Sequence, residues 1–102
     1  MSYSVVFAPE AVAQLEAIYA YVADKAGPDT ALRFTNAIID YCEGFTTFPR
    51  RGTLRKDLRP GLRTVGFRKR ATIAFAVLGN TITIVGIFYG GQDVESALNE
   101  DN

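Results

Sequence analysis

Apolar residues in the first half of the chain recur at helical spacing in two neighbouring stretches. The pattern predicts one helix over residues 9–26 and a second over residues 28–47, after a short strand over residues 3–8. Both helices begin with a proline followed by an acid. Proline loses nothing at a first helical position, because its missing N–H would have no intrahelical partner there. Since only Gly27 separates the two stretches, we expect an antiparallel helical hairpin.

The second half follows the two-residue period of strands. Residues 71–78 and 81–89 predict two long strands joined at Gly79-Asn80, a two-residue hairpin signal, and a weaker alternation predicts a strand over residues 62–68. Gly86, inside the last strand, indicates a bulge or a close approach by the second helix. Strict alternation along the last strand would place Ile82, Ile84 and Phe88 on one face and Thr81, Thr83, Val85, Ile87 and Tyr89 on the other.

These elements predict an α+β fold. An N-terminal strand and a helical hairpin precede a three-stranded antiparallel meander, and the helices pack on one face of a small, mostly antiparallel sheet. With 102 residues, 48% of them apolar, the chain is expected to form one domain over residues 1–102 with its own core. Residues from about 94 to 102 are expected to form a tail, with one helical turn near residues 94–98.

Charge changes this picture at residues 49–70, which we call the basic segment. It contains nine of the eleven Lys and Arg residues and one acid, so it carries a formal charge of +8 and the remainder carries −8. Such a concentrated field favours an anionic partner, either nucleic acid or an acidic protein surface; the alternative is a solvated basic loop without a specific ligand. The nine bases are Arg50, Arg51, Arg55, Lys56, Arg59, Arg63, Arg68, Lys69 and Arg70.

Composition also restricts the chemistry. Without histidine the chain cannot build Ser-His-Asp or Cys-His nucleophile systems. The single cysteine, Cys42, excludes an intrachain disulfide and is expected to be a core residue. A ribonuclease would have to use Arg, Lys and Tyr, and the candidates are Arg63, Arg68, Lys69 and Tyr89; the alternative for Tyr89 is a residue that caps the core. We expect no cofactor, no metal site and no membrane span, and a cytoplasmic location.

Several short motifs, in this order along the chain, resemble the ParE branch of the RelE/ParE toxin superfamily of bacterial toxin–antitoxin systems. They are the strand over residues 3–8 with the Pro-Glu-Ala helix start after it, residues 48–52, residues 58–63 (LRPGLR) and residues 84–93. The resemblance covers nearly the whole chain, and LRPGLR is its most specific part. The chain departs from the pattern at Tyr89, where many ParE-like members have histidine, and at Gln92, where many have arginine.

The resemblance implies a toxin of a type II toxin–antitoxin system that inhibits DNA gyrase by binding, without hydrolysis. A ParD-like antitoxin with a ribbon-helix-helix N-terminus would neutralise it, and DNA would be contacted only through the antitoxin or gyrase complex. The expected target-binding surface is Arg55, Arg59, Arg63 and Arg68. The expected antitoxin-binding residues, on an exposed apolar surface of the helical hairpin, are Ile18, Tyr21, Phe34, Ile38 and Tyr41.

Two alternatives remain open. One is a RelE-like, ribosome-dependent mRNA endonuclease that uses Arg63, Arg68, Lys69 and Tyr89. The other is a degenerate, non-toxic member that only binds its antitoxin.

Overall fold

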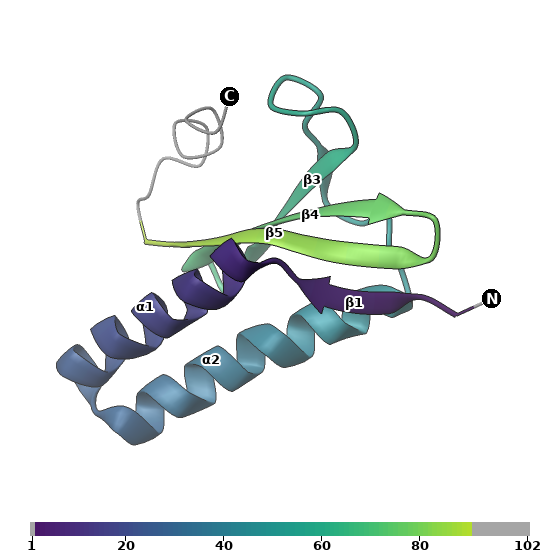
Figure 1. Cartoon of the computed structure of the whole chain (residues 1–102). Coiled ribbons are helices and arrows are strands. Elements are labelled where there is room, and N and C mark those ends of the chain that lie inside the picture. The colour runs from purple at the N-terminus through teal and green to yellow at the C-terminus, as the bar shows by residue number, and fades with distance from the viewer. Residues whose placement is uncertain (1, 91–102) are drawn as a thin grey trace.

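Two helices cover one face of a five-stranded sheet in the computed structural model, which describes residues 2–90 (Figure 1). The tail expected from about residue 94, its helical turn near residues 94–98, and Gln92 lie outside the described residues. The elements are β1 (Ser4–Phe7), α1 (Pro9–Ala26), α2 (Pro28–Glu43), the 3₁₀ turn η1 (Gly44–Thr46), β2 (Thr53–Leu54), β3 (Leu62–Phe67), β4 (Ala71–Leu78) and β5 (Thr81–Tyr89).

The sheet is mixed, with the spatial order β1-β5-β4-β3-β2. The strands β2 to β5 pair antiparallel, whereas β1 lies parallel to β5, with Val5 opposite Ile82. The first and last strands of the described chain are therefore neighbours, and β5 lies inside the sheet. This architecture confirms the predicted α+β fold. None of the helices in residues 2–90 is long and apolar enough to cross a membrane.

One helix end and one short strand differ from the prediction. The second helix ends at Glu43 rather than near Thr47, and the chain tightens into η1 there. The sequence pattern also missed β2, a two-residue strand in which Thr53 pairs with Thr64 of β3. Gly52 precedes β2 at a φ of 74°, and a Cβ at this position would collide with the Thr64 carbonyl. β2 is a strand because it pairs with β3. A strand of two residues is too short to show a periodicity in the sequence.

A β-bulge in β5 corrects the predicted faces of that strand. Phe75 of β4 pairs with Ile84, but Ala74 pairs with Gly86, so Val85 is an extra residue. After the bulge, Ile87 and Tyr89 point to the same side as Ile82 and Ile84, toward the helices, and Phe88 points to the opposite side. The strict alternation that grouped Phe88 with Ile82 and Ile84 is therefore wrong. The irregularity expected at Gly86 is confirmed, and the helix that approaches it is α1.

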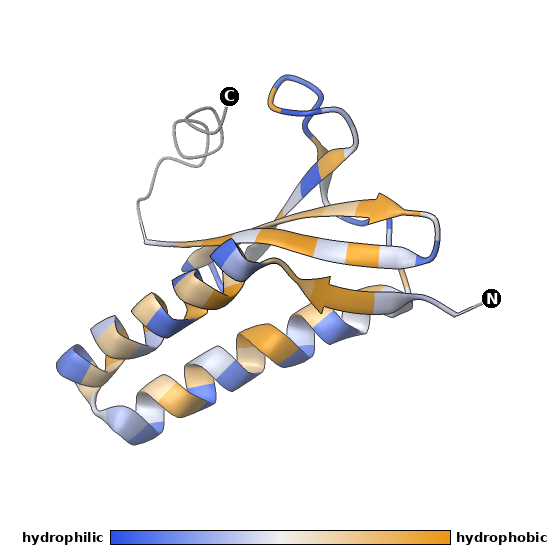
Figure 2. Cartoon of the chain, viewed as in Figure 1, coloured by the Kyte–Doolittle hydropathy of each residue, from blue (hydrophilic) through white to orange (hydrophobic). Residues whose placement is uncertain are grey.

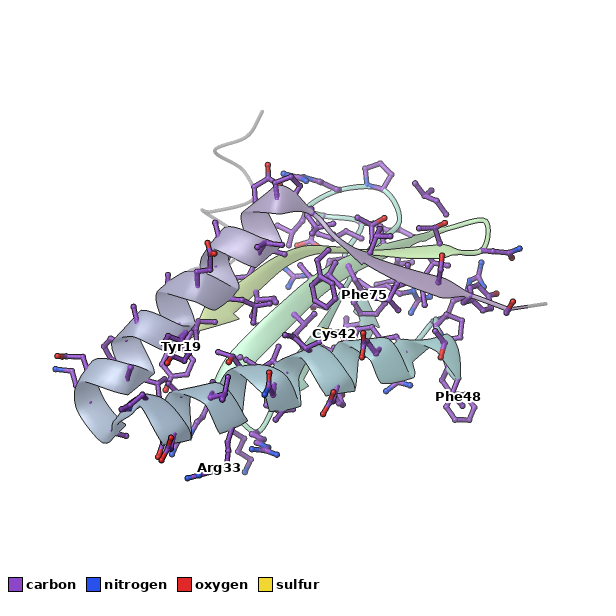
Figure 3. The ribbon with its side chains drawn as sticks, turned by 60° about the horizontal axis from the view of Figure 1, so that its bottom comes forward. Tyr19, Arg33, Cys42, Phe48 and Phe75 are labelled. Atoms are coloured by element: carbon purple, nitrogen blue, oxygen red, sulfur yellow. The ribbon has the colours of Figure 1, made fainter. Side chains whose placement is uncertain are left out.

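The main core lies between the helical hairpin and the sheet. Ile38, Cys42, Phe45 and Phe75 are fully buried there, and the Phe45 and Phe75 ring centroids are 4.6 Å apart. Figure 3 shows Cys42 and Phe75 in this layer, whereas Tyr19, Arg33 and Phe48 lie on the outside. The strongly apolar strands β4 and β5 form the centre of the sheet (Figure 2).

A smaller cluster covers part of the other face of the sheet. It consists of Leu62, Ala74 and Phe88, with Leu58 and Val85 packed against it. Leu58 belongs to the polar connection between β2 and β3, which projects on the side of the sheet away from the helices (Figure 2). The basic segment is thus anchored to the outer face of the sheet by an apolar side chain.

Candidate functional site

Arg63 of β3 lies within the basic segment and forms hydrogen bonds with the start of that segment. Its Nη1 donates hydrogen bonds to the backbone carbonyls of Arg50 (2.9 Å) and Arg51 (3.3 Å). Hydrogen bonds from a charged donor are stronger than neutral ones, so this guanidinium holds the connection before β2 against the sheet. One of the four residues expected to bind the target therefore already has a structural role.

Arg51 bonds the stretch of chain that follows the second helix. Its Nε donates to the carbonyl of Phe48 (2.9 Å), and its Nη2 donates to the carbonyl of Gly44 (3.2 Å). The guanidinium carbon lies 4.8 Å from the centroid of the Phe45 ring, within the range of a cation–π contact. The Gly44 carbonyl also accepts the Thr47 N–H (3.2 Å), so Arg51 adds a second bond to it and ties η1 to the residues that follow. Its positive charge near the C-terminal end of α2 is also favourable.

The LRPGLR motif forms a compact turn. The Leu62 N–H donates to the Arg59 carbonyl (3.2 Å) and Gly61 has a φ of 77°, which is the geometry of a type II turn centred on Pro60-Gly61. Beside it, Arg55 forms a bidentate ion pair with Asp57 (3.0 and 2.7 Å). The hydrogen bond from Arg55 holds the pKa of the Asp57 carboxyl below its ordinary value.

Arg68, Lys69 and Arg70 lie in the turn between β3 and β4, and all three are exposed. β3 separates them from the LRPGLR turn by roughly 17 Å, at ~3.4 Å per residue. The structure therefore divides the expected target-binding surface into two regions. Arg55 and Arg59 lie together at one end of β3, and Arg68 lies at the other.

Tyr89 belongs to a row of aromatic rings between the helical hairpin and the end of the sheet. Its ring centroid lies 5.7 Å from that of Tyr21 and 5.5 Å from that of Phe34. Tyr89 is half-buried and pairs with Ala71, next to the β3–β4 turn. The row continues through Phe67, 6.0 Å from Phe34, to Tyr41, 5.2 Å from Phe67.

A groove lies between α1 and β5. β1 pairs with β5 only as far as Ile84, so among the described residues the outer edge of β5 beyond this point has no strand neighbour. The Gln14 side chain fills part of the gap, and its Oε1 accepts a hydrogen bond from the Ile87 N–H (2.6 Å). A pocket of about 390 Å³ remains, lined by Gln14, Ala17, Ile18, Tyr21, Ile87, Tyr89 and Gly90. The sequence pattern gave no sign of this groove apart from Gly86.

The exposure expected for the antitoxin-binding residues is wrong for three of the five. Ile18, Phe34 and Ile38 are buried because the apolar faces of both helices turn toward the sheet. Tyr21 is 53% exposed and Tyr41 is half-buried. The large apolar side chains that the helical hairpin exposes are Val12, Tyr19, Tyr21 and Leu32.

Residues 5–94 of the sequence match a family model described as the ParE toxin of the type II toxin–antitoxin system parDE. The chain belongs to the ParE toxin family. A comparison with curated proteins found no match.

Solved structures of toxin–antitoxin systems share the fold of this ParE-family chain. One is described as the chromosomal ParDE system from P. aeruginosa; it is 27% identical with a TM-score of 0.75, and the match covers 86% of this chain and 96% of that chain. Another, the RelBE2 toxin–antitoxin complex from Mycobacterium tuberculosis, is 16% identical with a TM-score of 0.59, and the match covers 87% of this chain and 99% of that chain. The second similarity concerns the fold alone.

The four residues considered for ribonuclease chemistry do not all lie together in this ParE-family toxin. Arg68 and Lys69 lie near Tyr89 at one end of the sheet. Arg63 pairs with Phe75, four residues along β4 from the partner of Tyr89, roughly 13 Å away at ~3.4 Å per residue. Cys42 is not a candidate nucleophile, because burial raises the pKa of its thiol to about 12. Residues 2–90 contain no group of three or more Cys, Asp or Glu residues placed to hold a metal ion.

Proposed function

We propose that this ParE-family toxin inhibits DNA gyrase by binding it in the cytoplasm, and that a ParD-like antitoxin with a ribbon-helix-helix N-terminus neutralises it. The observation that carries the proposal is the family match over residues 5–94, together with the similarity to a ParDE system. A fold does not fix an activity, so the proposal depends on the residues that the surface offers.

The geometry favours binding over RNA cleavage. Of the four candidate catalytic residues, Arg63 is engaged with two backbone carbonyls, and Tyr89 is half-buried in the aromatic row. Arg55, which is paired with Asp57, and Arg59 lie half-buried at one end of β3, and Arg68 lies exposed at the other end. In this proposal these three bases meet acidic groups on gyrase or its DNA. Charges of this kind mainly raise the association rate and specificity.

The α1–β5 groove is the proposed antitoxin site. It offers an apolar floor at Ile18, an exposed aromatic ring at Tyr21, and a strand edge beyond Ile84. An extended peptide that paired with this edge would displace Gln14 from the Ile87 N–H or pair beyond it. Aromatic side chains in such positions often supply much of the binding energy. Phe34 and Ile38 support the groove and the aromatic row from the core, and Tyr41 offers a partly exposed ring at the far end of that row.

Two assays on the purified toxin test the proposed target. In a gyrase supercoiling assay, we expect loss of supercoiling or accumulation of cleaved DNA, and no cleavage of mRNA in a translation reaction. Defined cuts in mRNA within ribosomes, with gyrase unaffected, would reject the proposal and support the endonuclease alternative. Normal growth on expression, with neither effect but intact antitoxin binding, would instead support a non-toxic antitoxin-binding member.

A pair of variants tests the antitoxin site. Tyr21→Ala removes a ring that lines the groove, whereas Tyr19→Ala removes an exposed ring on the same helix that does not. By isothermal titration calorimetry with the cognate antitoxin, we expect Tyr21→Ala to weaken binding by about 2 kcal/mol, roughly thirtyfold, and Tyr19→Ala to change it little. Equal losses in both variants would place the antitoxin elsewhere on the helical hairpin.

A further inference from the structure

The turn between β3 and β4 holds two basic residues in a backbone conformation that does not suit them. The Arg70 N–H donates to the Phe67 carbonyl (3.0 Å), so Arg68 and Lys69 are the two central residues of a tight turn. Their φ angles are 51° and 57°. Positive φ at both central positions defines a type I′ turn, in which Asn-Gly is strongly preferred because a Cβ disfavours the left-handed region.

The other two-residue turn of the same meander provides a comparison. Between β4 and β5 the chain uses Gly79-Asn80, and the residue at positive φ (58°) is the glycine. One hairpin of the sheet therefore has an unstrained turn, and the neighbouring hairpin carries strain at two adjacent positions. Backbone strain of this kind is concentrated at functional sites. The strain therefore indicates a role for the side chains of Arg68 and Lys69.

The three bases of this turn present their charge to solvent. Arg68, Lys69 and Arg70 are all exposed, and within residues 2–90 none of them forms an ion pair shorter than 4.0 Å. Arg51, Arg55 and Arg63 of the same basic segment are instead bonded to carbonyls or to Asp57.

The turn is also tied to neighbouring groups at two points. The Gly90 N–H donates to the Arg70 carbonyl (2.8 Å), which ties the turn to the end of β5. The Arg68 guanidinium carbon lies 4.9 Å from the centroid of the Phe67 ring, a contact that orients the side chain. Ordering these groups on binding would therefore cost less conformational entropy than ordering a free loop.

We propose that the Arg68-Lys69-Arg70 turn is a direct contact site for the phosphates of nucleic acid. Three consecutive exposed bases at a tight turn suit a backbone that carries one charge per ~3.4 Å of each strand. The planar arginine fork matches phosphate geometry. An acidic protein surface fits less well, because the exposed residues of the turn include no apolar anchor. The proposal adds a contact made by this chain itself to those expected through the antitoxin or gyrase, and it does not depend on gyrase being the target.

The test uses the full chain with the turn changed to Arg68→Asn and Lys69→Gly. Since the new residues suit a type I′ turn, the melting temperature should rise while nucleic-acid binding weakens. Fluorescence anisotropy with a labelled DNA duplex and with a labelled single-stranded RNA, from 50 to 200 mM salt, measures binding and shows which nucleic acid is preferred. For the variant at 50 mM salt we expect a loss of affinity of about tenfold or more and, with two phosphate contacts removed, a salt slope lower by about 2.

A matched control removes the same charge from the same segment. Arg50→Asn with Lys56→Asn neutralises two exposed bases outside the turn and should leave affinity and salt slope closer to those of the unchanged chain.

Equal losses in both double variants would show diffuse attraction and overturn the assignment. So would an unchanged salt slope in the turn variant, or the absence of binding by the unchanged chain at 50 mM salt. Tighter binding to poly-glutamate than to either nucleic acid would assign the turn to an acidic protein instead. A lower melting temperature of the turn variant would overturn the argument from strain.

Discussion

The backbone N–H of Ile87 donates a 2.6 Å hydrogen bond to the side-chain Oε1 of Gln14, a residue 73 positions earlier in the chain. The bond joins α1 to β5 just after the bulge at Val85, where the described residues give β5 no strand neighbour on this side. A glutamine side chain thus takes the place that a neighbouring strand would occupy. It satisfies a partly buried N–H that would otherwise lack an acceptor.

Removing that acceptor should destabilise the protein. Gln14→Ala leaves the Ile87 N–H without its partner, and we expect a loss of about 1–3 kcal/mol in the free energy of unfolding. For a domain of this size, each kcal/mol corresponds to a fall in melting temperature of roughly 4–8 °C. Urea unfolding measures the difference. Gln14→Glu is the control, since its carboxylate can still accept the bond and should retain most of the stability. Equal stability of the alanine variant and the unchanged chain would contradict the role of the bond.

Gly86 leaves no room for a side chain. A Cβ there would lie 2.8 Å from two ring atoms of Phe88, which is buried, and 3.3 Å from the Gln14 Oε1. Gly86→Ala is therefore expected to cost about 1–3 kcal/mol of unfolding free energy, as for other overpacked sites. Gly66 in β3 is the matched control, because a Cβ at that position meets nothing within 4 Å. If both alanine variants unfold at the same urea concentration, the crowding at Gly86 is not significant.

The main elements of the fold are predictable because their signals are local. Pro9 and Pro28 mark the helix starts, and Gly79-Asn80 marks the turn between two apolar strands. The bulge at Val85 is different, since a one-residue slip exchanges the faces of a strand. Ile84 and Ile87 can both face the helices only because of that slip, and alternation along the sequence cannot reveal it.

The candidate site was visible from the sequence as charge but not as geometry. Nine bases in one segment are apparent in the composition, whereas the bond from Arg63 to the Arg50 carbonyl depends on how β3 meets the preceding connection. Similarly, the apolar spacing of α1 predicts a buried face but does not show that Ile18 lies beneath the surface while Tyr21 remains exposed. Both outcomes follow from the way the helical hairpin and the sheet pack together.

Arg63 should matter more for stability than an exposed base of the same segment. Arg63→Ala removes two hydrogen bonds to the carbonyls of Arg50 and Arg51, and we expect a loss of about 1–3 kcal/mol in the free energy of unfolding. Lys56→Ala, at an exposed position, should stay within about 0.5 kcal/mol of the unchanged chain. Chemical denaturation of the two variants decides between a structural and a purely ligand-binding role for Arg63. Equal stabilities would favour the ligand-binding role.

Cys42 should make stability depend on pH under alkaline conditions. Burial, with a smaller contribution from Glu43, raises the pKa of its thiol from 9.0 to about 12. Between these values the unfolded chain loses the proton and the folded chain keeps it, so unfolding is favoured as the pH rises. Cys42→Ala should cost about 1–2 kcal/mol at pH 7 through the cavity it leaves. The difference in unfolding free energy between the unchanged chain and this variant should then shrink from pH 9 to pH 10.5. A constant difference across urea titrations in that range would show that the thiol ionises equally in both states.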